Sequence, residues 1–192
     1  IPSMDEHQVV VSVNSSVPTI SEPSVSVTLY QGLPKSDKMD SVVQKAVEMG
    51  VTRIVPMLTQ RCVSRPDQKS AQKKVERWQK ISFEAAKQCG RGILPPISPL
   101  TDFSAALRQS ASESTVLFFY EGGGQSLQQC IDSSCKAYSI FIGPEGGFSE
   151  EEVQFALDLG AKKATLGPRI LRTETAPVAA LAAIMLTTGN MT

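Results

Sequence analysis

"YSIFIGPEGGFSEEEV", residues 138–153, joins three kinds of local sequence. YSIFI is a continuous apolar run, which is typical of a strand that is buried on both faces of a sheet. GPEGG (143–147) is turn-forming, and its glycines would let a ligand approach the backbone. Ser149 and Glu152 have the spacing of a capping box, which predicts a helix over 150–159. A buried strand that enters a helix through such a loop indicates an α/β fold.

The same alternation of strands and helices continues from Lys38 to the C-terminal region. Apolar residues share one face of the first helix of this series: Met39, Val42, Val43, Ala46 and Val47. Strands are predicted at 51–57, 115–120, 138–142 and 164–167, and helices at 38–49, 68–89, 126–131 and 150–159, from about 102, and from about 175. This order predicts a mostly parallel sheet covered by helices on both faces, with ligands bound beyond the carboxyl ends of its strands.

Residues 1–33 have a different pattern. QVVVSV and SVSVTLY are rich in β-forming residues, and the segment between them, NSSVPTISEP, is polar and turn-forming. These residues are too few for a closed β domain. We therefore predict a partial N-terminal β segment with its linker at 1–33 and an α/β domain at 34–192.

The composition of the chain argues against a membrane-spanning protein and against a secreted one. The chain has 192 residues, with 19 Lys and Arg against 19 Asp and Glu. No apolar run approaches the about 20 residues that span a bilayer, and no segment has the layout of a signal peptide. The expected location is a cytoplasm, or an organelle stroma or matrix if the source is eukaryotic.

The cysteines and the single histidine do not form a metal site in sequence. None of the four cysteines belongs to a CxxC motif, and His7 is distant from all of them. We therefore expect free thiols and no metal. A Ser-His-Asp or Cys-His mechanism has His7 as its only candidate base.

Basic residues are concentrated in one segment, 61–91. It carries nine basic residues against three acidic ones. The basic residues are Arg61, Arg65, Lys69, Lys73, Lys74, Arg77, Lys80, Lys87 and Arg91. The segment is either the solvated face of a helix or a surface that attracts phosphate.

A second glycine-containing loop, LGPRILRTETAP (166–177), follows the strand predicted at 164–167. Two such loops at one edge of a sheet could cradle a small polar molecule with backbone groups, although both could also be ordinary turns. Arginines of the second loop could stabilise a developing anion or hold a phosphate. Alternatively, Thr175 caps the next helix and Glu174 pairs with an arginine. Neither loop has the spacing of a Rossmann turn or a P-loop.

Four segments, in this order, resemble the RsmE family of 16S ribosomal RNA uridine-N3 methyltransferases in the SPOUT superfamily. They are KSDKMDSVVQKAVEMGVTRIVPMLTQRCVSR, KKVERWQKISFEAAKQCGR, IGPEGGFSEEEV and LGPRILRTETA. The resemblance extends over roughly residues 30–190. It implies a parallel α/β sheet with a C-terminal deep trefoil knot, S-adenosylmethionine as cofactor, and a homodimer that associates through the knot helices. It also implies an N-terminal PUA-like β-barrel, of which residues 1–33 could supply only a remnant.

The same resemblance assigns roles to individual residues. Arg172 matches the arginine that is expected to face the target base. The cofactor-binding residues would be Phe119, Gly143, Glu145, Gly146, Gly147, Leu166, Gly167, Ile170 and Leu171. The 16S ribosomal RNA of the small subunit would be gripped by Arg61, Arg65, Arg91 and Arg169.

The expected reaction is methyl transfer to uridine N3, with Arg172 favouring the base anion. Glu174 is a candidate proton acceptor, although a capping or ion-pairing role is favoured. Two alternatives remain open: an RNA-binding protein that kept the SPOUT fold but lost catalysis, and a nicotinamide-dependent oxidoreductase. The second is disfavoured because the fingerprint and the acidic ribose partner of such enzymes are missing.

Overall fold

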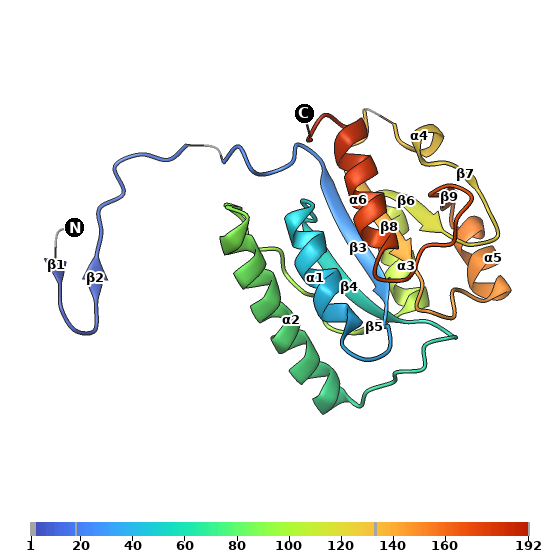
Figure 1. The fold of residues 1–192 in the computed structure, drawn as a ribbon, viewed down its shortest axis with the longest axis horizontal. Coiled ribbons are helices and arrows are strands. Elements are labelled where there is room, and N and C mark those ends of the chain that lie inside the picture. Colours follow the sequence, from blue (N-terminus) through green and yellow to red (C-terminus); the bar gives the residue numbers. More distant parts are fainter. Residues whose placement is uncertain (1–2, 18, 133, 192) are drawn as a thin grey trace.

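A seven-stranded sheet forms the centre of the molecule, as Figure 1 shows. The computed structural model describes residues 3–17, 19–132 and 134–191. The strands of the sheet are β3 (Ser26–Gly32), β4 (Arg53–Leu58), β5 (Thr101–Asp102), β6 (Thr115–Phe119), β7 (Gln125–Ser126), β8 (Ala137–Ile142) and β9 (Lys162–Thr165). They lie in the order β5-β4-β3-β8-β6-β9-β7, and each neighbouring pair is parallel. The prediction of an α/β fold with a mostly parallel sheet is confirmed.

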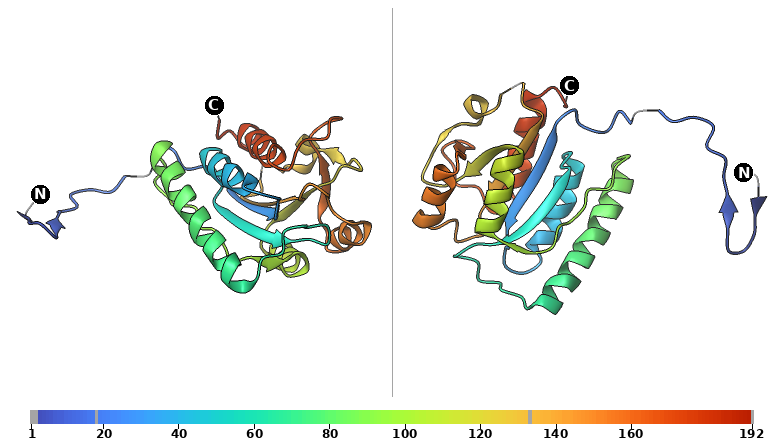
Figure 2. Two further views of the ribbon diagram at one scale, coloured as in Figure 1. Left: turned by 60° about the horizontal axis from the view of Figure 1, so that its bottom comes forward. Right: turned by 180° about the vertical axis from the view of Figure 1, so that it is seen from behind.

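Helices cover both faces of this sheet. They are α1 (Lys38–Glu48), α2 (Gln68–Gln88), α3 (Phe103–Glu113), α4 (Leu127–Cys130), α5 (Glu150–Asp158) and α6 (Ala176–Thr187). Apolar residues of α1, α2, α4 and α6 form one buried cluster with the sheet, and those of α3 and α5 form the other. Figure 2 shows α1 and α6 on the opposite side of the sheet from α3 and α5.

Strand residues alternate between the two clusters, as the period of a strand requires. In β6, Leu117 belongs to the first cluster and Phe118 to the second; in β8, Ile140 and Phe141 do the same. The second cluster is aromatic: the rings of Phe118 and Phe148 have centroids 4.3 Å apart. Because both strands are buried on both faces, their sequences are continuous apolar runs.

Local signals explain where the helices begin. The predicted face of α1 is fully buried. At α5, the Ser149 hydroxyl accepts from the Glu152 N–H, and the Glu152 carboxylate accepts from the Ser149 N–H, so the predicted capping box is confirmed. At α2, the Asp67 carboxylate accepts a hydrogen bond from the Ser70 N–H at 2.7 Å.

The predicted boundary between the two domains needs a correction. The sequence pattern places Ser26–Gly32 in the N-terminal β segment, yet these residues form β3, which pairs in parallel with both β4 and β8. Alternating residues alone could not distinguish a barrel strand from a sheet strand. The α/β unit therefore begins upstream of residue 34, and the segment outside it is shorter than predicted.

The part of the chain before β3 includes a small hairpin of β1 (Ser3–Met4) and β2 (Val9–Val10), which lies apart from the sheet in Figure 1. The apolar side chains of this hairpin are exposed; Met4, for example, is 73% exposed and Val9 is 53% exposed. No helix among the described residues is long and apolar enough to cross a membrane. All four cysteines are free.

Candidate active site

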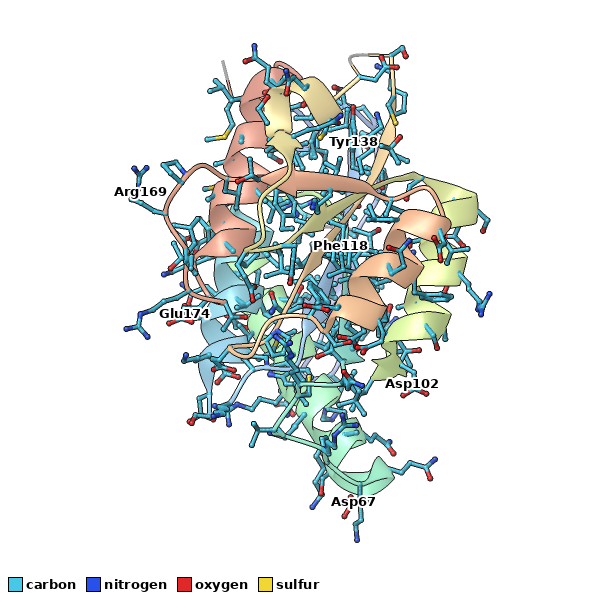
Figure 3. The ribbon with its side chains drawn as sticks, turned by 90° about the vertical axis from the view of Figure 1, so that its right-hand side faces the viewer. Asp67, Asp102, Phe118, Tyr138, Arg169 and Glu174 are labelled. Atoms are coloured by element: carbon cyan, nitrogen blue, oxygen red, sulfur yellow. The ribbon has the colours of Figure 1, made fainter. Side chains whose placement is uncertain are left out.

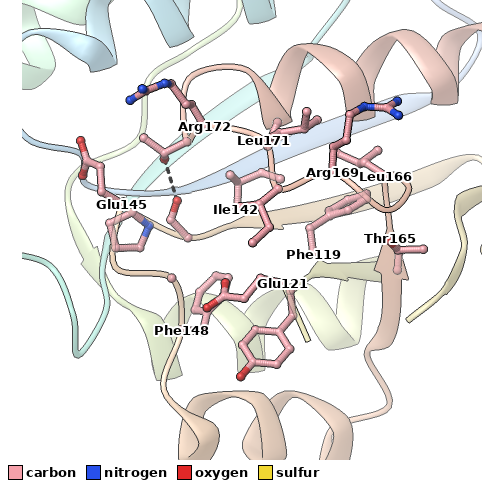
Figure 4. Close-up of a pocket in the computed structure, with 18 of the residues that line it drawn as sticks. Phe119, Glu121, Ile142, Glu145, Phe148, Thr165, Leu166, Arg169, Leu171 and Arg172 are labelled. Carbon is pink, nitrogen blue, oxygen red and sulfur yellow. Dashed lines mark hydrogen bonds between the residues drawn. The ribbon is translucent and has the colours of Figure 1, made fainter. Parts of the chain in front are cut away.

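A cavity of about 330 Å³ lies at the carboxyl edge of the sheet. Three neighbouring strands, β8, β6 and β9, end there, and the loops that follow them meet (Figure 4). The apolar part of its lining includes Phe119, Ile142, Phe148, Ala164, Leu166 and Leu171. Its size and composition match those of sites for small organic ligands.

A buried hydrogen-bond network fixes the two glycine-containing loops against each other. Gln31, at the end of β3, donates from Nε2 to the Thr173 hydroxyl at 3.0 Å and to the Gly143 carbonyl at 3.4 Å. The Thr173 hydroxyl in turn donates to the Gly143 carbonyl at 2.7 Å. Gln31 is fully buried and Thr173 is 6% exposed. The network therefore joins the first loop, the second loop and the end of β3.

Gly147 occupies a position that other residues would disturb for two reasons. Its φ is +67°, in the left-handed region that side chains disfavour. A Cβ there would lie 2.7 and 2.9 Å from the two carboxylate oxygens of Glu121. The turn thus brings bare backbone and a carboxylate together in the cavity wall.

Glu145 connects the first loop to the start of α1. Its carboxylate accepts from the Lys35 N–H at 3.2 Å and pairs with Lys38 Nζ at 3.0 Å. Burial alone would raise the pKa of Glu145, but hydrogen bonds from its own N–H, Lys38 and Lys35 lower that pKa overall. Lys38 also lies 3.4 Å from the Glu174 carboxylate. One ammonium group therefore bridges both loops.

This arrangement decides between the alternatives for Glu174. The carboxylate pairs with a lysine instead of an arginine, and Glu174 does not line the cavity. Thr175 makes no capping hydrogen bond with its side chain. The geometry gives Glu174 a loop-bracing role and provides no support for it as a proton acceptor.

Most of the predicted cofactor residues meet in the cavity wall. These are Phe119, Gly143, Glu145, Gly147, Leu166, Gly167, Ile170 and Leu171. Gly146 does not line the cavity, and its cofactor-binding role stays a prediction. A Cβ on Gly146 would face Arg61 at 3.1 Å, and the Arg61 guanidinium donates to the Gly146 carbonyl at 3.0 Å. Gly146 therefore contacts the β4–α2 loop on the other side of the turn.

The second loop presents two arginines at the mouth of the cavity. Arg169 and Arg172 both line it and both are exposed (Figure 4). Figure 3 shows Arg169 projecting away from the body of the protein, whereas Phe118 lies inside. In the part of the chain that the structure describes, no carboxylate pairs with Arg172. Its guanidinium is thus available to a ligand.

The arginines predicted to bind RNA differ in their surroundings. The prediction that Arg91 binds RNA is wrong, because its side chain is only 3% exposed and its guanidinium pairs with Glu22 at 2.6 Å. It also donates to the Val47 and Val51 carbonyls. Arg65 is exposed, although one of its nitrogens donates to the Thr59 carbonyl at 2.8 Å.

The basic segment supplies a different exposed set along α2. Lys69, Lys73 and Lys80 are exposed and have no ion pair among the described residues. Arg77, by contrast, pairs with Asp37 at 3.7 Å, and Lys87 pairs with Glu84 at 3.2 Å. The unpaired lysines leave α2 with an excess of positive charge on its solvent face.

Several residues of the site are not predicted from the sequence as parts of it, and Lys38, Glu121 and Thr173 are polar ones whose side chains line the cavity or join its loops. Glu121 follows the buried run TVLFFY directly, so the end of a predicted strand was the available signal. Lys38 and Thr173 have no such signal, because their partners are distant along the chain; Thr173 and Gln31, for example, are 142 residues apart.

The described residues fit a nucleoside-containing cofactor such as S-adenosylmethionine. Apolar side chains form one part of the cavity, and the glycines of both loops leave the backbone accessible. At Gly167, φ is +102° and nothing lies within 4 Å of the place where a Cβ would be. A ring system could therefore approach the main chain there.

Comparisons with known proteins point in the same direction. A family model described as an RNA methyltransferase domain matches residues 21–185. The ribosomal RNA small subunit methyltransferase E of Bacillus subtilis is 38% identical, over 85% of this chain and 66% of that protein. The Aquifex aeolicus protein of the same name is 35% identical, over 85% of this chain and 69% of its own length. The chain thus spans about two thirds of the length of these relatives.

Solved structures agree with the sequence relatives. The crystal structure of a ribosomal RNA small subunit methyltransferase E from Neisseria gonorrhoeae bound to S-adenosyl methionine is 40% identical, with a TM-score of 0.80. The match covers 86% of this chain and 67% of that one. A TrmH/SpoU tRNA modifying enzyme of Aquifex aeolicus, at 11% identity and a TM-score of 0.55, shares the fold alone. This chain belongs to the RsmE family of ribosomal RNA small subunit methyltransferases.

Proposed function

We propose that this protein transfers a methyl group from S-adenosylmethionine to N3 of a uridine in the 16S ribosomal RNA of the small subunit. The observation that carries the proposal is a nucleoside-sized cavity at the carboxyl edge of the sheet, with Arg172, which pairs with no carboxylate among the described residues, at its mouth. The S-adenosyl methionine bound by the Neisseria gonorrhoeae relative supports the choice of cofactor.

When bound, the cofactor supplies a methyl group on a positively charged sulfur, and the protein must hold the acceptor in line with it. Gly143, Gly147 and Gly167 would bring backbone to the cofactor, with Phe119 and Leu171 against its apolar part. Arg172 would lie beside the target base.

Uridine N3 carries a proton, which it must lose before it can attack. At N3 the proton leaves to water at the exposed mouth, the nitrogen lone pair forms the new N–C bond, and the C–S bond breaks. The Arg172 guanidinium would stabilise the negative charge that develops on N3 and O4. A cation free of protein partners suits this role, and among the described residues the Arg172 guanidinium has no ion pair.

The RNA would contact the exposed basic surface beside the cavity. Arg61, Arg65 and Arg169 are exposed, and Lys69, Lys73 and Lys80 extend the positive charge along α2. Phosphate contacts of this kind make affinity fall with salt. Replacing these three lysines by alanine should weaken binding to 16S RNA and lower the salt dependence, whereas affinity for S-adenosylmethionine should not change.

A homodimer is the proposed assembly, associated through α6. Leu186 is 61% exposed, and Val178, Ala179, Ala182 and Ala183 are only half-buried, so part of this apolar helix faces outward. Sedimentation velocity on the wild type and on Val178→Glu would test the assembly. A dimer that the substitution does not weaken would contradict this interface.

Family membership supports three further proposals. The C-terminal loops and α6 would form a deep trefoil knot, the segment before β3 would be the end of a PUA-like barrel, and the protein would work in the cytoplasm or in an organelle matrix. The exposed apolar side chains of the β1–β2 hairpin support the proposal that this segment packs against other β strands.

Two measurements test the proposed activity together. Calorimetric titration would be made with S-adenosylmethionine, S-adenosylhomocysteine and NAD, and methyl incorporation would be measured on small ribosomal subunits. Binding of the first two ligands with methylation of 16S RNA is the expected result. Binding of RNA without methylation would indicate an inactive RNA-binding member of the fold, and binding of NAD alone would indicate an oxidoreductase.

A further inference from the structure

Glu121 is a carboxylate in the cavity wall for which the reaction outlined above has no use. It lines the cavity and is exposed, and Figure 4 shows it beside Phe148. The other cavity carboxylate, Glu145, is held by Lys38 at 3.0 Å. In the described part of the chain, by contrast, Glu121 has neither an ion pair nor a hydrogen bond. Both of its oxygens are thus free to accept hydrogen bonds from a ligand.

The backbone opposite Glu121 leaves room for this carboxylate. A side chain at Gly147 would meet the Glu121 oxygens at 2.7 and 2.9 Å, so the two positions depend on each other. Glycine at 147 therefore both permits a positive φ of +67° and preserves the place of the carboxylate.

Glu121 also lies at the position in the sheet from which acidic residues bind ribose in other α/β proteins. The glycine-rich loop follows β8, and Glu121 comes shortly after β6, the strand that pairs with β8 in parallel. In doubly wound folds, the glycine loop and the acidic residue that binds the ribose hydroxyls likewise follow neighbouring strands. A carboxylate can accept from two hydroxyls at once, and such charge-assisted bonds are strong.

We propose that Glu121 binds the ribose hydroxyls of the cofactor and so determines affinity for the nucleoside part. The proposal rests on the proposed function, because it takes S-adenosylmethionine as the cofactor. A competing role is attraction of the positive sulfur by the Glu121 charge. The two roles make different predictions, since S-adenosylhomocysteine keeps the ribose but lacks the sulfonium.

The test is calorimetric titration of the wild type, Glu121→Ala and Glu121→Gln with S-adenosylmethionine and S-adenosylhomocysteine. If Glu121 binds ribose, Glu121→Ala should lower the affinity for both ligands by similar factors, about 10-fold to 100-fold. Glu121→Gln keeps the shape of the side chain and one acceptor oxygen, so its affinity for both ligands should fall less. Glu113→Gln is the matched control, because Glu113 pairs with Arg53 outside the cavity. This variant should bind both ligands with the affinity of the wild type.

The 2′-deoxyribose analogue of S-adenosylhomocysteine completes a double-mutant cycle. The wild type should bind this analogue more weakly than the parent ligand, whereas Glu121→Ala should bind the two about equally. A loss in Glu121→Ala confined to S-adenosylmethionine would overturn the ribose role in favour of charge, and unchanged affinities would overturn any role in cofactor binding. If the wild type binds neither S-adenosylmethionine nor S-adenosylhomocysteine, the proposed function fails as well.

Discussion

The two loops that form the cavity differ in how firmly the rest of the molecule holds them. The first, 143–147, is attached to three other segments: Lys35 and Lys38 bond Glu145, Arg61 bonds the Gly146 carbonyl, and the buried Gln31 and Thr173 bond the Gly143 carbonyl. The first loop is thus fixed from several directions.

The second loop, 166–177, is held mainly at Thr173 and Glu174. Thr173 is buried in the network, but Arg169 and Arg172 are exposed and Ile170 is 83% exposed. We therefore propose a division of roles between the two loops. The first is a fixed wall for the cofactor, and the second presents reactive groups to the RNA. Substitutions in the exposed part should therefore change activity, and those at the attachment points should change stability.

Arg172→Ala is the strongest test of this division. The substitution removes the only group proposed to stabilise the base anion, so methyl transfer should fall by about 100-fold to 1,000-fold. Affinity for S-adenosylmethionine and the melting temperature should hardly change, because the side chain is exposed and unpaired in the described structure.

Arg169→Ala is the control, since Arg169 belongs to the same loop and is also exposed. It should raise KM for the RNA and leave kcat nearly unchanged, as expected for a phosphate contact. Equal losses of kcat in the two variants would mean that the loop acts as a unit and that Arg172 has no special role.

Thr173→Val tests the attachment of the second loop to the first. The variant keeps the shape of the side chain but removes the donor to the Gly143 carbonyl and the acceptor for Gln31. Because the buried Gln31 would lose its hydroxyl partner and the Gly143 carbonyl would keep only the longer 3.4 Å bond from Gln31, unfolding free energy should fall by about 1–3 kcal/mol. Urea denaturation measures this loss.

Thr187→Val provides the comparison for Thr173→Val. The Thr187 hydroxyl also donates to a carbonyl at 2.7 Å, that of Ala183, but its site on α6 is exposed. The free energy of unfolding should therefore fall by no more than about 0.5 kcal/mol in Thr187→Val. Should both variants lose the same stability, the buried network would not be what holds the second loop.

The sequence predicted much of what is local in this molecule. The capping box of Ser149 and Glu152, the buried face of α1 and the buried strands β6 and β8 all depend on residues within one or two turns or one strand. The two cavity loops were also identified, because each comes directly after a predicted strand.

Contacts between distant segments could not be predicted in the same way. Arg91 is basic and follows a basic helix, but its partner Glu22 is 69 residues upstream, in the linker, so a predicted RNA contact is a buried ion pair. Ser26–Gly32 was assigned to the N-terminal segment, because its place between β4 and β8 depends on strand order. Gly146 and Gly147 are neighbours in one turn but face opposite sides of it, Arg61 and Glu121 respectively. A sequence pattern does not predict which side each glycine faces.

Lys38→Met should have the smallest effect and tests whether one ammonium group couples the two loops. Since hydrogen bonds and the Lys38 charge outweigh burial and hold the pKa of Glu145 below its ordinary value of 4.5, this carboxylate stabilises the fold fully above pH 4.5. That contribution is lost as the pH falls through the lowered pKa. The pKa of Lys38 is raised by its bond to Glu145, so the contribution of Lys38 is lost only at high pH.

Thermal melts between pH 3 and pH 7 would measure the effect. In Lys38→Met the melting temperature should fall slightly at pH 7, and the difference from the wild type should shrink as Glu145 becomes protonated. Lys45→Met, on the same helix but without an ion pair among the described residues, should show no such convergence. A constant difference at all these pH values would mean that Lys38 contributes by packing, and the two loops would then be coupled by Thr173 and Gln31 alone.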